Sequence, residues 1–169
     1  MDLTPIHRIH VAYVWLNHFH VQLVALDVSR VDTRAVFSTH CSALLAGLSG
    51  TSGPQLSLDG QLLALRTLLQ NVDDARSQAD VFRFQGMLTG ISRQLPLLLG
   101  LLDKFEKDTN LTSQVGLQIH IDNIRLNVFE LYIDLKLLYD QLHLFFDMQQ
   151  YIPIVRSRSA VDLSRNARP

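Results

Sequence analysis

Histidine and aspartate side chains near the two ends of this 169-residue sequence have spacings that could hold a metal ion. His7 and His10 are three residues apart, which places both imidazoles on one face of a helix. Asp140 and His143 have the same spacing and resemble half of the Glu-x-x-His ligand pair of di-iron helical bundles. The other half of that pattern is missing. We therefore expect a solvated polar face and no metal, and keep a metal-binding helical bundle using these four residues as an alternative.

The sequence offers no convincing nucleophile or cofactor motif. Cys41 follows His40 directly, but neighbouring residues on a helix point in different directions, and Cys41 falls on the apolar face of its segment. A thiol in that position behaves as a small core residue. The sequence contains no glycine-rich phosphate loop, zinc-ligand spacing or nucleotide fingerprint. We therefore predict a protein that is not an enzyme and that binds no cofactor.

The composition is that of a folded chain that does not cross a membrane. Apolar residues make up 47% and charged residues 18%, with a formal net charge of −1. The longest uninterrupted run of apolar, glycine and proline residues, from Leu95 to Leu102, is far shorter than the roughly 20 residues of a membrane span. The sequence has one cysteine, and its first residues lack the features of a signal peptide. We expect a cytoplasmic or otherwise intracellular location.

The C-terminal segment differs in charge from the rest of the chain. Residues 152–169 carry one aspartate and four arginines, which are Arg156, Arg158, Arg165 and Arg168. That segment therefore has a charge of +3 and leaves −4 for the remaining residues. We predict a single helical domain over residues 1–151, followed by a flexible basic tail over residues 152–169 that could contact nucleic acid or another anion.

Apolar residues recur in steps of three and four along most of the chain, which predicts helices. Residues 6–28 also fit a β-hairpin, but an isolated two-stranded ribbon among helices is the less stable choice. A Gly/Ser-rich loop is expected over residues 47–56, and residues 71–80 fit either a turn or a projecting helix. Pro96 should kink its helix. The expected buried faces are Ala12, Leu16, Phe19, Leu23 and Leu26; Phe37, Cys41, Leu44 and Leu48; Leu58, Leu62, Leu65, Leu69 and Val72; and Phe84, Leu88, Ile91, Leu95, Leu98, Leu102 and Phe105.

The stretch from Gly116 to Phe146 can be interpreted as an alternating strand or as a helix. Alternation fails at Phe129-Glu130 and at Leu137-Leu138, and a strand of this length would be exceptional. The helical pattern has no break, so residues 111–149 should form one long helix that is the spine of the domain. Its expected buried seam is Leu117, Ile121, Ile124, Val128, Leu131, Leu135, Leu138, Leu142 and Phe145. We predict an all-α bundle of four to five helices.

A second apolar stripe lies on the opposite side of this long helix. A helix that is apolar on two sides is normally buried on both, and the shorter helices can cover only one side along its whole length. We therefore expect the stripe to contact another copy of the chain or a helical partner protein, in the manner of a coiled coil. The predicted interface residues are Ile119, Leu126, Ile133, Leu137 and Leu144, flanked by Tyr132 and Tyr139.

Three short fragments occur in an order known from another family. They are "MDLTP" at Met1–Pro5, "ALR" at Ala64–Arg66 and "RQL" at Arg93–Leu95. With a helical domain and a basic C-terminal segment, these fragments resemble hepadnavirus core proteins. The long final helix and the sparse arginines depart from that pattern. The resemblance implies capsid-like assembly and packaging of nucleic acid as an alternative function.

Overall fold

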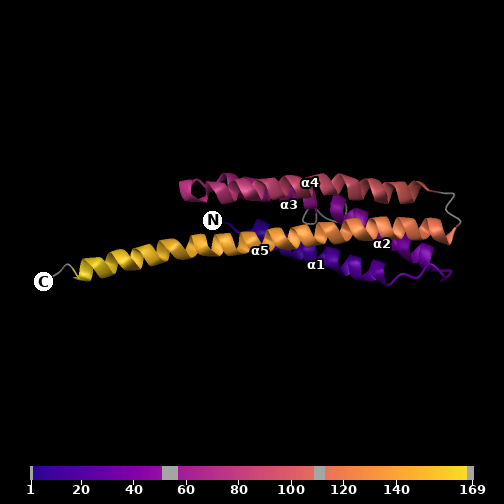
Figure 1. The fold of residues 1–169 in the computed structure, drawn as a ribbon, viewed down its shortest axis with the longest axis horizontal. Helices are drawn as coiled ribbons and strands as arrows, with labels where there is room; N and C mark the ends of the chain where they lie inside the picture. The colour runs from indigo at the N-terminus through magenta and orange to yellow at the C-terminus, as the bar shows by residue number, and fades with distance from the viewer. Residues whose placement is uncertain (1, 51–56, 109–112, 167–169) are drawn as a thin grey trace.

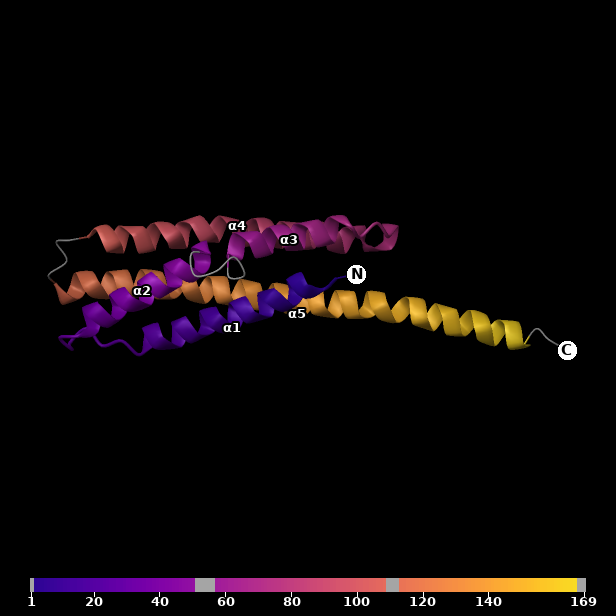
Figure 2. The ribbon, with the colours of Figure 1, turned by 180° about the vertical axis from the view of Figure 1, so that it is seen from behind.

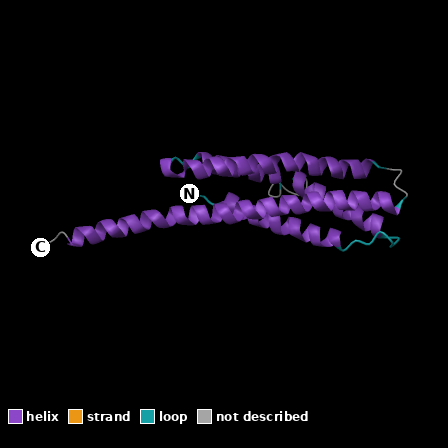
Figure 3. Ribbon diagram, viewed as in Figure 1, coloured by secondary structure: helices purple, strands orange, loops and turns teal. Residues whose placement is uncertain are grey.

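The protein is an all-α helical bundle. The computed structural model describes the backbone of residues 2–50, 57–108 and 113–166, with side chains through Asp147. Figure 3 shows only helices and loops in these parts of the chain. The elements are α1 (Thr4–Val24), α2 (Thr33–Ser49), α3 (Leu58–Gln70), the one-turn 3₁₀ helix η2 (Ala75–Ser77), α4 (Gln78–Lys107) and α5 (Gln114–Asn166). The predicted fold class is confirmed.

The helices lie side by side in four rods, and each rod runs antiparallel to the one before it in the chain. α1 is the first rod, α2 and α3 together form the second, and α4 and α5 are the third and fourth (Figures 1 and 2). Rings of His10 and Tyr139 lie 5.1 Å apart, and those of His20 and Phe129 lie 4.8 Å apart, so α1 is antiparallel to α5. Short connections between successive rods favour this up-and-down arrangement.

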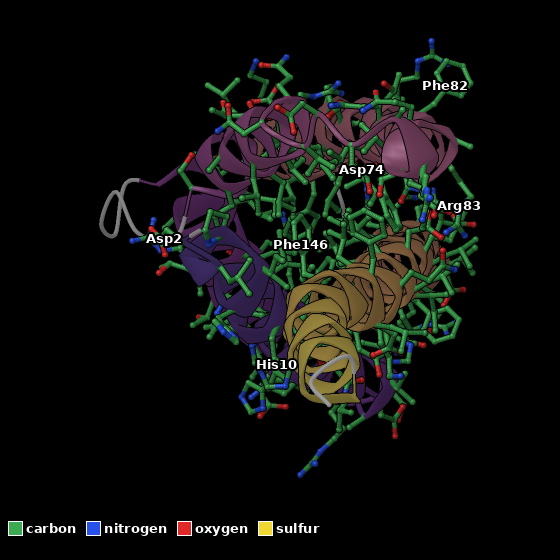
Figure 4. The ribbon with its side chains drawn as sticks, turned by 90° about the vertical axis from the view of Figure 1, so that its left-hand side faces the viewer. Asp2, His10, Asp74, Phe82, Arg83 and Phe146 are labelled. Carbon is green, nitrogen blue, oxygen red and sulfur yellow. The ribbon has the colours of Figure 1, made fainter. Side chains whose placement is uncertain are left out.

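A single apolar core runs along the bundle axis. It contains the buried faces predicted for α1 to α4, except that Leu26 and Val72 are only partly buried at its edge. All nine predicted seam residues of α5 are buried, and Phe146 joins them at 2% exposure. Figure 4 shows Phe146 in the interior at the end of the bundle. The periodicity therefore located the core correctly.

The N-terminal segment is a helix and not a hairpin. α1 begins at Thr4, and Pro5 lies in its first turn, where the missing N–H is not needed. Its buried residues repeat with helical spacing, from Ile6 to Leu23. The packing of α1 along α5 gives this valine-rich segment a continuous apolar surface to cover, which decides between the two conformations.

The second rod is interrupted between α2 and α3. α2 continues to Ser49, so the expected loop of residues 47–56 starts too early by three residues. Gly47 is buried inside the helix, and the chain leaves it at Gly50, whose φ of 77° is the left-handed value that glycine tolerates best. Residues 51–56 lie outside the described residues. α3 then begins at Leu58, and the hydroxyl of its N-cap residue Ser57 accepts a hydrogen bond from the Gly60 amide.

A short turn separates α3 from α4. In residues 71–80 the chain turns, forms η2 and enters α4, and the Asp74 carboxylate accepts the Arg76 amide at the start of η2. Of the two alternatives for this segment, the turn is correct. α4 then continues through Pro96 without interruption. One missing hydrogen bond is tolerated there because the buried residues on both sides of Pro96 hold the helix on the core.

α5 is longer than the sequence predicted. It runs from Gln114 to Asn166, whereas residues 111–149 were expected. Residues 109–112 lie outside the described residues. The helix continues past Gln149 because the sequence up to Asn166 has no glycine and only one proline to stop it. The backbone of residues 152–166 is thus helical, and the C-terminal part of α5 extends beyond the other rods (Figure 1).

Candidate interaction surface

An exposed apolar stripe follows the outer side of α5, opposite its buried seam. Ile119, Leu126, Ile133, Leu137 and Leu144 are between 41% and 62% exposed. At about 100° per residue these positions fall within about 40° of arc around the helix axis. Val115, 71% exposed, falls within the same arc. The apolar residues predicted from the sequence therefore form an exposed row along one side of α5, which we call the α5 stripe.

Aromatic contacts fix the side of α5 that faces α1. Tyr132 and Tyr139 are partly buried, and their rings lie 6.0 and 5.5 Å from the ring of Tyr13 on α1. Further along, Phe129 stacks at an angle on His20, which is also on α1. The two tyrosines were expected to flank an interface with another molecule. Here they help to fasten α1 to α5, and the stripe lies beside them.

Polar contacts fix the side of α5 that faces α4. The Arg83 guanidinium donates to the Gln141 side-chain oxygen at 2.6 Å, and the Gln94 amide donates to Asp134. At the opposite end, His120 lies 3.0 Å from Asp108. With α1 on one side and α4 on the other, α5 cannot rotate to bury its stripe. The stripe therefore stays on the molecular surface.

Four charged residues line the α1 side of the stripe. Arg125 lies 3.6 Å from Asp122, and Lys136 lies 3.1 Å from Asp140. The hydrogen bond from Lys136 to Asp140 raises the pKa of the lysine, so its charge is retained at neutral pH. Along the helix the signs therefore read minus, plus, plus, minus. This order is the same when the helix is turned end for end.

An apolar groove adjoins the stripe on its α4 side. It has a volume of about 240 Å³ and lies between α4 and α5, with Met87, Gly90, Ile91, Asp134 and Leu137 around it. No atom outside the local helix backbone lies within 4 Å of where a Cβ on Gly90 would stand. Because glycine has no side chain, this part of the surface stays hollow and can receive a side chain from another helix.

The candidate metal ligands do not form a metal site in the part of the chain that the structure describes. The His10 ring lies 5.1 Å from the Tyr139 ring, while His143 stacks on the same tyrosine ring and lies 3.3 Å from Asp147. Asp140 pairs with Lys136, and His7 is exposed. Among the described residues, no three His, Cys, Asp or Glu side chains gather as they would around a metal ion.

A cavity of about 150 Å³ between α2 and α4 contains the only cysteine. It is lined by Cys41, Arg34 and Phe105 among others, and Arg34 donates to the backbone carbonyl of Asp108 at 3.4 Å. Burial raises the pKa of the Cys41 thiol to about 12. Since the thiolate is the reactive form, Cys41 is not poised as a nucleophile at neutral pH.

Three of the four predicted anion-contacting arginines lie on the distal part of α5. Arg156, Arg158 and Arg165 fall within the helical backbone, and Arg168 lies outside the described residues.

Within the described residues, no helix has the length and hydropathy needed to cross a membrane. No protein-family model, curated protein or solved structure matches this chain.

Proposed function

We propose that this protein is a non-enzymatic assembly protein that associates through the α5 stripe, with a second copy of the chain or with a helical partner protein. The observation that supports this proposal is the exposed row of leucine and isoleucine side chains opposite the buried seam of α5. Single exposed apolar residues are common on protein surfaces, but several of them aligned in one row and flanked by charges are typical of an interaction site.

Association would remove the apolar side chains of the α5 stripe from water, which is favourable. A leucine-sized side chain contributes roughly 1.5–3 kcal/mol when it goes from fully exposed to fully buried. Leu126 and Ile133 are about half exposed, so each has a large part of that free energy still available. Two copies of each residue contribute in a symmetric pair. These four half-exposed side chains supply about 3–6 kcal/mol, a large part of the roughly 8 kcal/mol of a micromolar association, and the other residues of the stripe add to it.

The experiment replaces both Leu126 and Ile133 by aspartate. Burying unpaired carboxylates in the interface would cost several kcal/mol, so the variant should not associate. The side chains are exposed in the single chain, so its helical circular dichroism should be unchanged. Molar mass by light scattering measures the association. A variant that stays folded and has the same mass as the wild type would contradict the proposal.

A matched control places the same two charges on another exposed apolar pair. Phe82 and Leu97 on α4 are 82% and 63% exposed, and neither belongs to the α5 stripe. Figure 4 shows Phe82 on the outer edge of the molecule. The variant with Phe82→Asp and Leu97→Asp should keep the mass of the wild type. Loss of association in both variants would indicate a general effect of charge, not a specific surface.

A second candidate function is that of a capsid-like or nucleic-acid-packaging structural protein. It is favoured by the charge of +3 on residues 152–169, against −4 on the rest of the chain. Phosphate binding by arginine releases counterions, so affinity for nucleic acid should fall steeply with salt. Deleting residues 154–169 should abolish this binding and leave the α5 stripe intact. Binding that survives the deletion, or that is insensitive to salt, would exclude this function.

A further inference from the structure

We infer that the occupant of the α5 stripe is a second copy of this chain, with the two α5 helices packed antiparallel about a two-fold axis. This inference rests on the proposed function and specifies its partner and geometry. Three features of the described residues support it: the spacing of the stripe, the order of the flanking charges, and the groove beside Leu137.

The spacing of the stripe is nearly symmetric end to end. The midpoint between Ile119 and Leu144 falls between residues 131 and 132, and the midpoint between Leu126 and Leu137 falls at the same place. An antiparallel copy centred on this point therefore sets Ile119 level with Leu144 of the second copy, and Leu126 level with Leu137 of the second copy. A two-fold dimer needs a surface that complements itself in this way.

The flanking charges are neutralised in the same register. A two-fold axis lying between the helices and perpendicular to them brings the α1 sides of the two stripes together. Arg125 then lies about 3 Å along the axis from the level of Asp140 of the second copy, given a rise of about 1.5 Å per residue. With Asp122 and Lys136 included, each end of the interface holds two acidic and two basic groups.

A parallel pair fits the same residues less well. Every residue would be level with its own copy, and the α1 sides of the two stripes would lie on opposite flanks of the interface. Arg125 and Asp140 of different copies would be about 22 Å apart along the axis at about 1.5 Å per residue. The four charged residues of one copy would then not meet those of the other, so a parallel pair lacks the charge compensation of the antiparallel one.

The groove between α4 and α5 adds a complementary shape to this register. Leu137 is one of its lining residues, and Leu126 of the second copy lies level with Leu137. The leucine side chain of one copy can therefore enter the hollow above Gly90 of the other. By the two-fold symmetry this contact occurs twice, once on each side of the axis.

Cysteine cross-linking tests the antiparallel geometry in the full-length chain. Ile133→Cys lies next to the two-fold axis and should cross-link to its own copy under mild oxidation. Ile119→Cys and Leu144→Cys each lie about 38 Å from their own copy, from about 1.5 Å per residue. Neither should cross-link alone, but a mixture of the two should give a cross-linked dimer. The wild type, whose Cys41 is buried, is the control and should give none.

A charge exchange tests the register independently. Arg125→Asp alone and Asp140→Arg alone each leave an unbalanced group of charges, so each should raise the dimer dissociation constant about tenfold or more. The chain that carries both substitutions restores the balance and should return to within about threefold of the wild-type constant. Asp140 is exposed and Arg125 is partly exposed, and circular dichroism checks that each variant remains folded.

The possible outcomes separate this inference from the proposed function. Cross-linking at all three cysteines alone would indicate a parallel pair and overturn the inference. An associating wild type that gives no cross-link, or single charge variants that the double exchange does not rescue, would overturn it as well. In these cases the loss of association in the Leu126→Asp, Ile133→Asp variant would still support the proposed function. A wild type that is monomeric at every concentration would overturn both the inference and self-association.

Discussion

Gly47 of α2 packs directly against the indole ring of Trp15 on α1. A Cβ atom on residue 47 would stand 2.3 Å from Cζ2 of Trp15, which no real pair of atoms tolerates. Gly47→Ala should therefore lower the free energy of unfolding by about 1–3 kcal/mol, as overpacking of a core does. A Cβ atom on residue 100 would meet nothing within 4 Å, so Gly100→Ala should raise the free energy of unfolding by about 0.5–1 kcal/mol. Urea unfolding measures both, and equal effects would contradict the contact.

Two histidines at helix contacts make stability depend on pH. Burial lowers the pKa of His20, and the charge of Arg125 lowers it further. Burial also lowers the pKa of His40, with a smaller contribution from His18. The unfolded chain therefore binds protons more readily than the folded chain once the pH falls toward the ordinary histidine value of 6.5. Stability should decrease as the pH falls from neutral through that value.

Urea unfolding at neutral pH and at about pH 5 measures this effect. A histidine whose pKa is lowered in the folded protein makes the fold less stable as the pH falls across that interval. His20→Gln and His40→Gln should each reduce the difference in unfolding free energy between the two conditions. Carboxylates with lowered pKa values, such as Asp27, act at more acidic pH. A wild type that is equally stable at both pH values, or more stable at the lower one, would contradict this account.

Contacts of this kind could not be predicted from the sequence. The sequence does not show that Gly47 packs on the Trp15 ring, because this contact depends on how α1 and α2 cross. The same is true of His20 on Phe129. By contrast, burial of Cys41 followed from its place in a helical repeat, and its exposed fraction of 6% confirms that prediction. Periodicity reports the face of a helix, but not the partner that the face contacts.

At the scale of elements, α4 contains a proline in its interior. Pro96 provides no N–H for the turn before it, and the helix continues only because its buried face is held on the core. Pro96→Ala should raise the free energy of unfolding by about 2 kcal/mol, since the gain of about 3 in the helix is partly offset in the unfolded chain. Thermal unfolding measures the change. A lower melting temperature would show that the proline stabilises this turn.

The exposed residue next to Pro96 provides the control. Leu97 is 63% exposed, so Leu97→Ala should change the free energy of unfolding by no more than about 0.5 kcal/mol.

The boundaries of α2 and α5 show the limit of sequence analysis at this scale. Helix interiors were predicted from apolar spacing, while helix ends depend on local competition between caps, glycine and continued packing.

At the scale of the molecule, the other rods cover the inner side of the long helix α5, and its outer side stays exposed. The fold class followed from the sequence because five amphipathic segments joined by short loops have few other ways to bury their faces. The path of α2 and α3 as one interrupted rod did not follow, because it depends on how both pack on α1 and α4. The exposed stripe on α5 was predicted from its second apolar periodicity, and its use as an interface stays a proposal.

Molar mass across a dilution series of the wild-type chain tests the central claim most directly. At high concentration light scattering should give twice the 19.2 kDa of one chain, and the mass should fall toward 19.2 kDa on dilution. The Leu126→Asp, Ile133→Asp variant should remain at 19.2 kDa throughout, with an unchanged helical spectrum. A wild type at 19.2 kDa at every concentration, or a folded variant that matches a dimeric wild type, would contradict self-association through the α5 stripe.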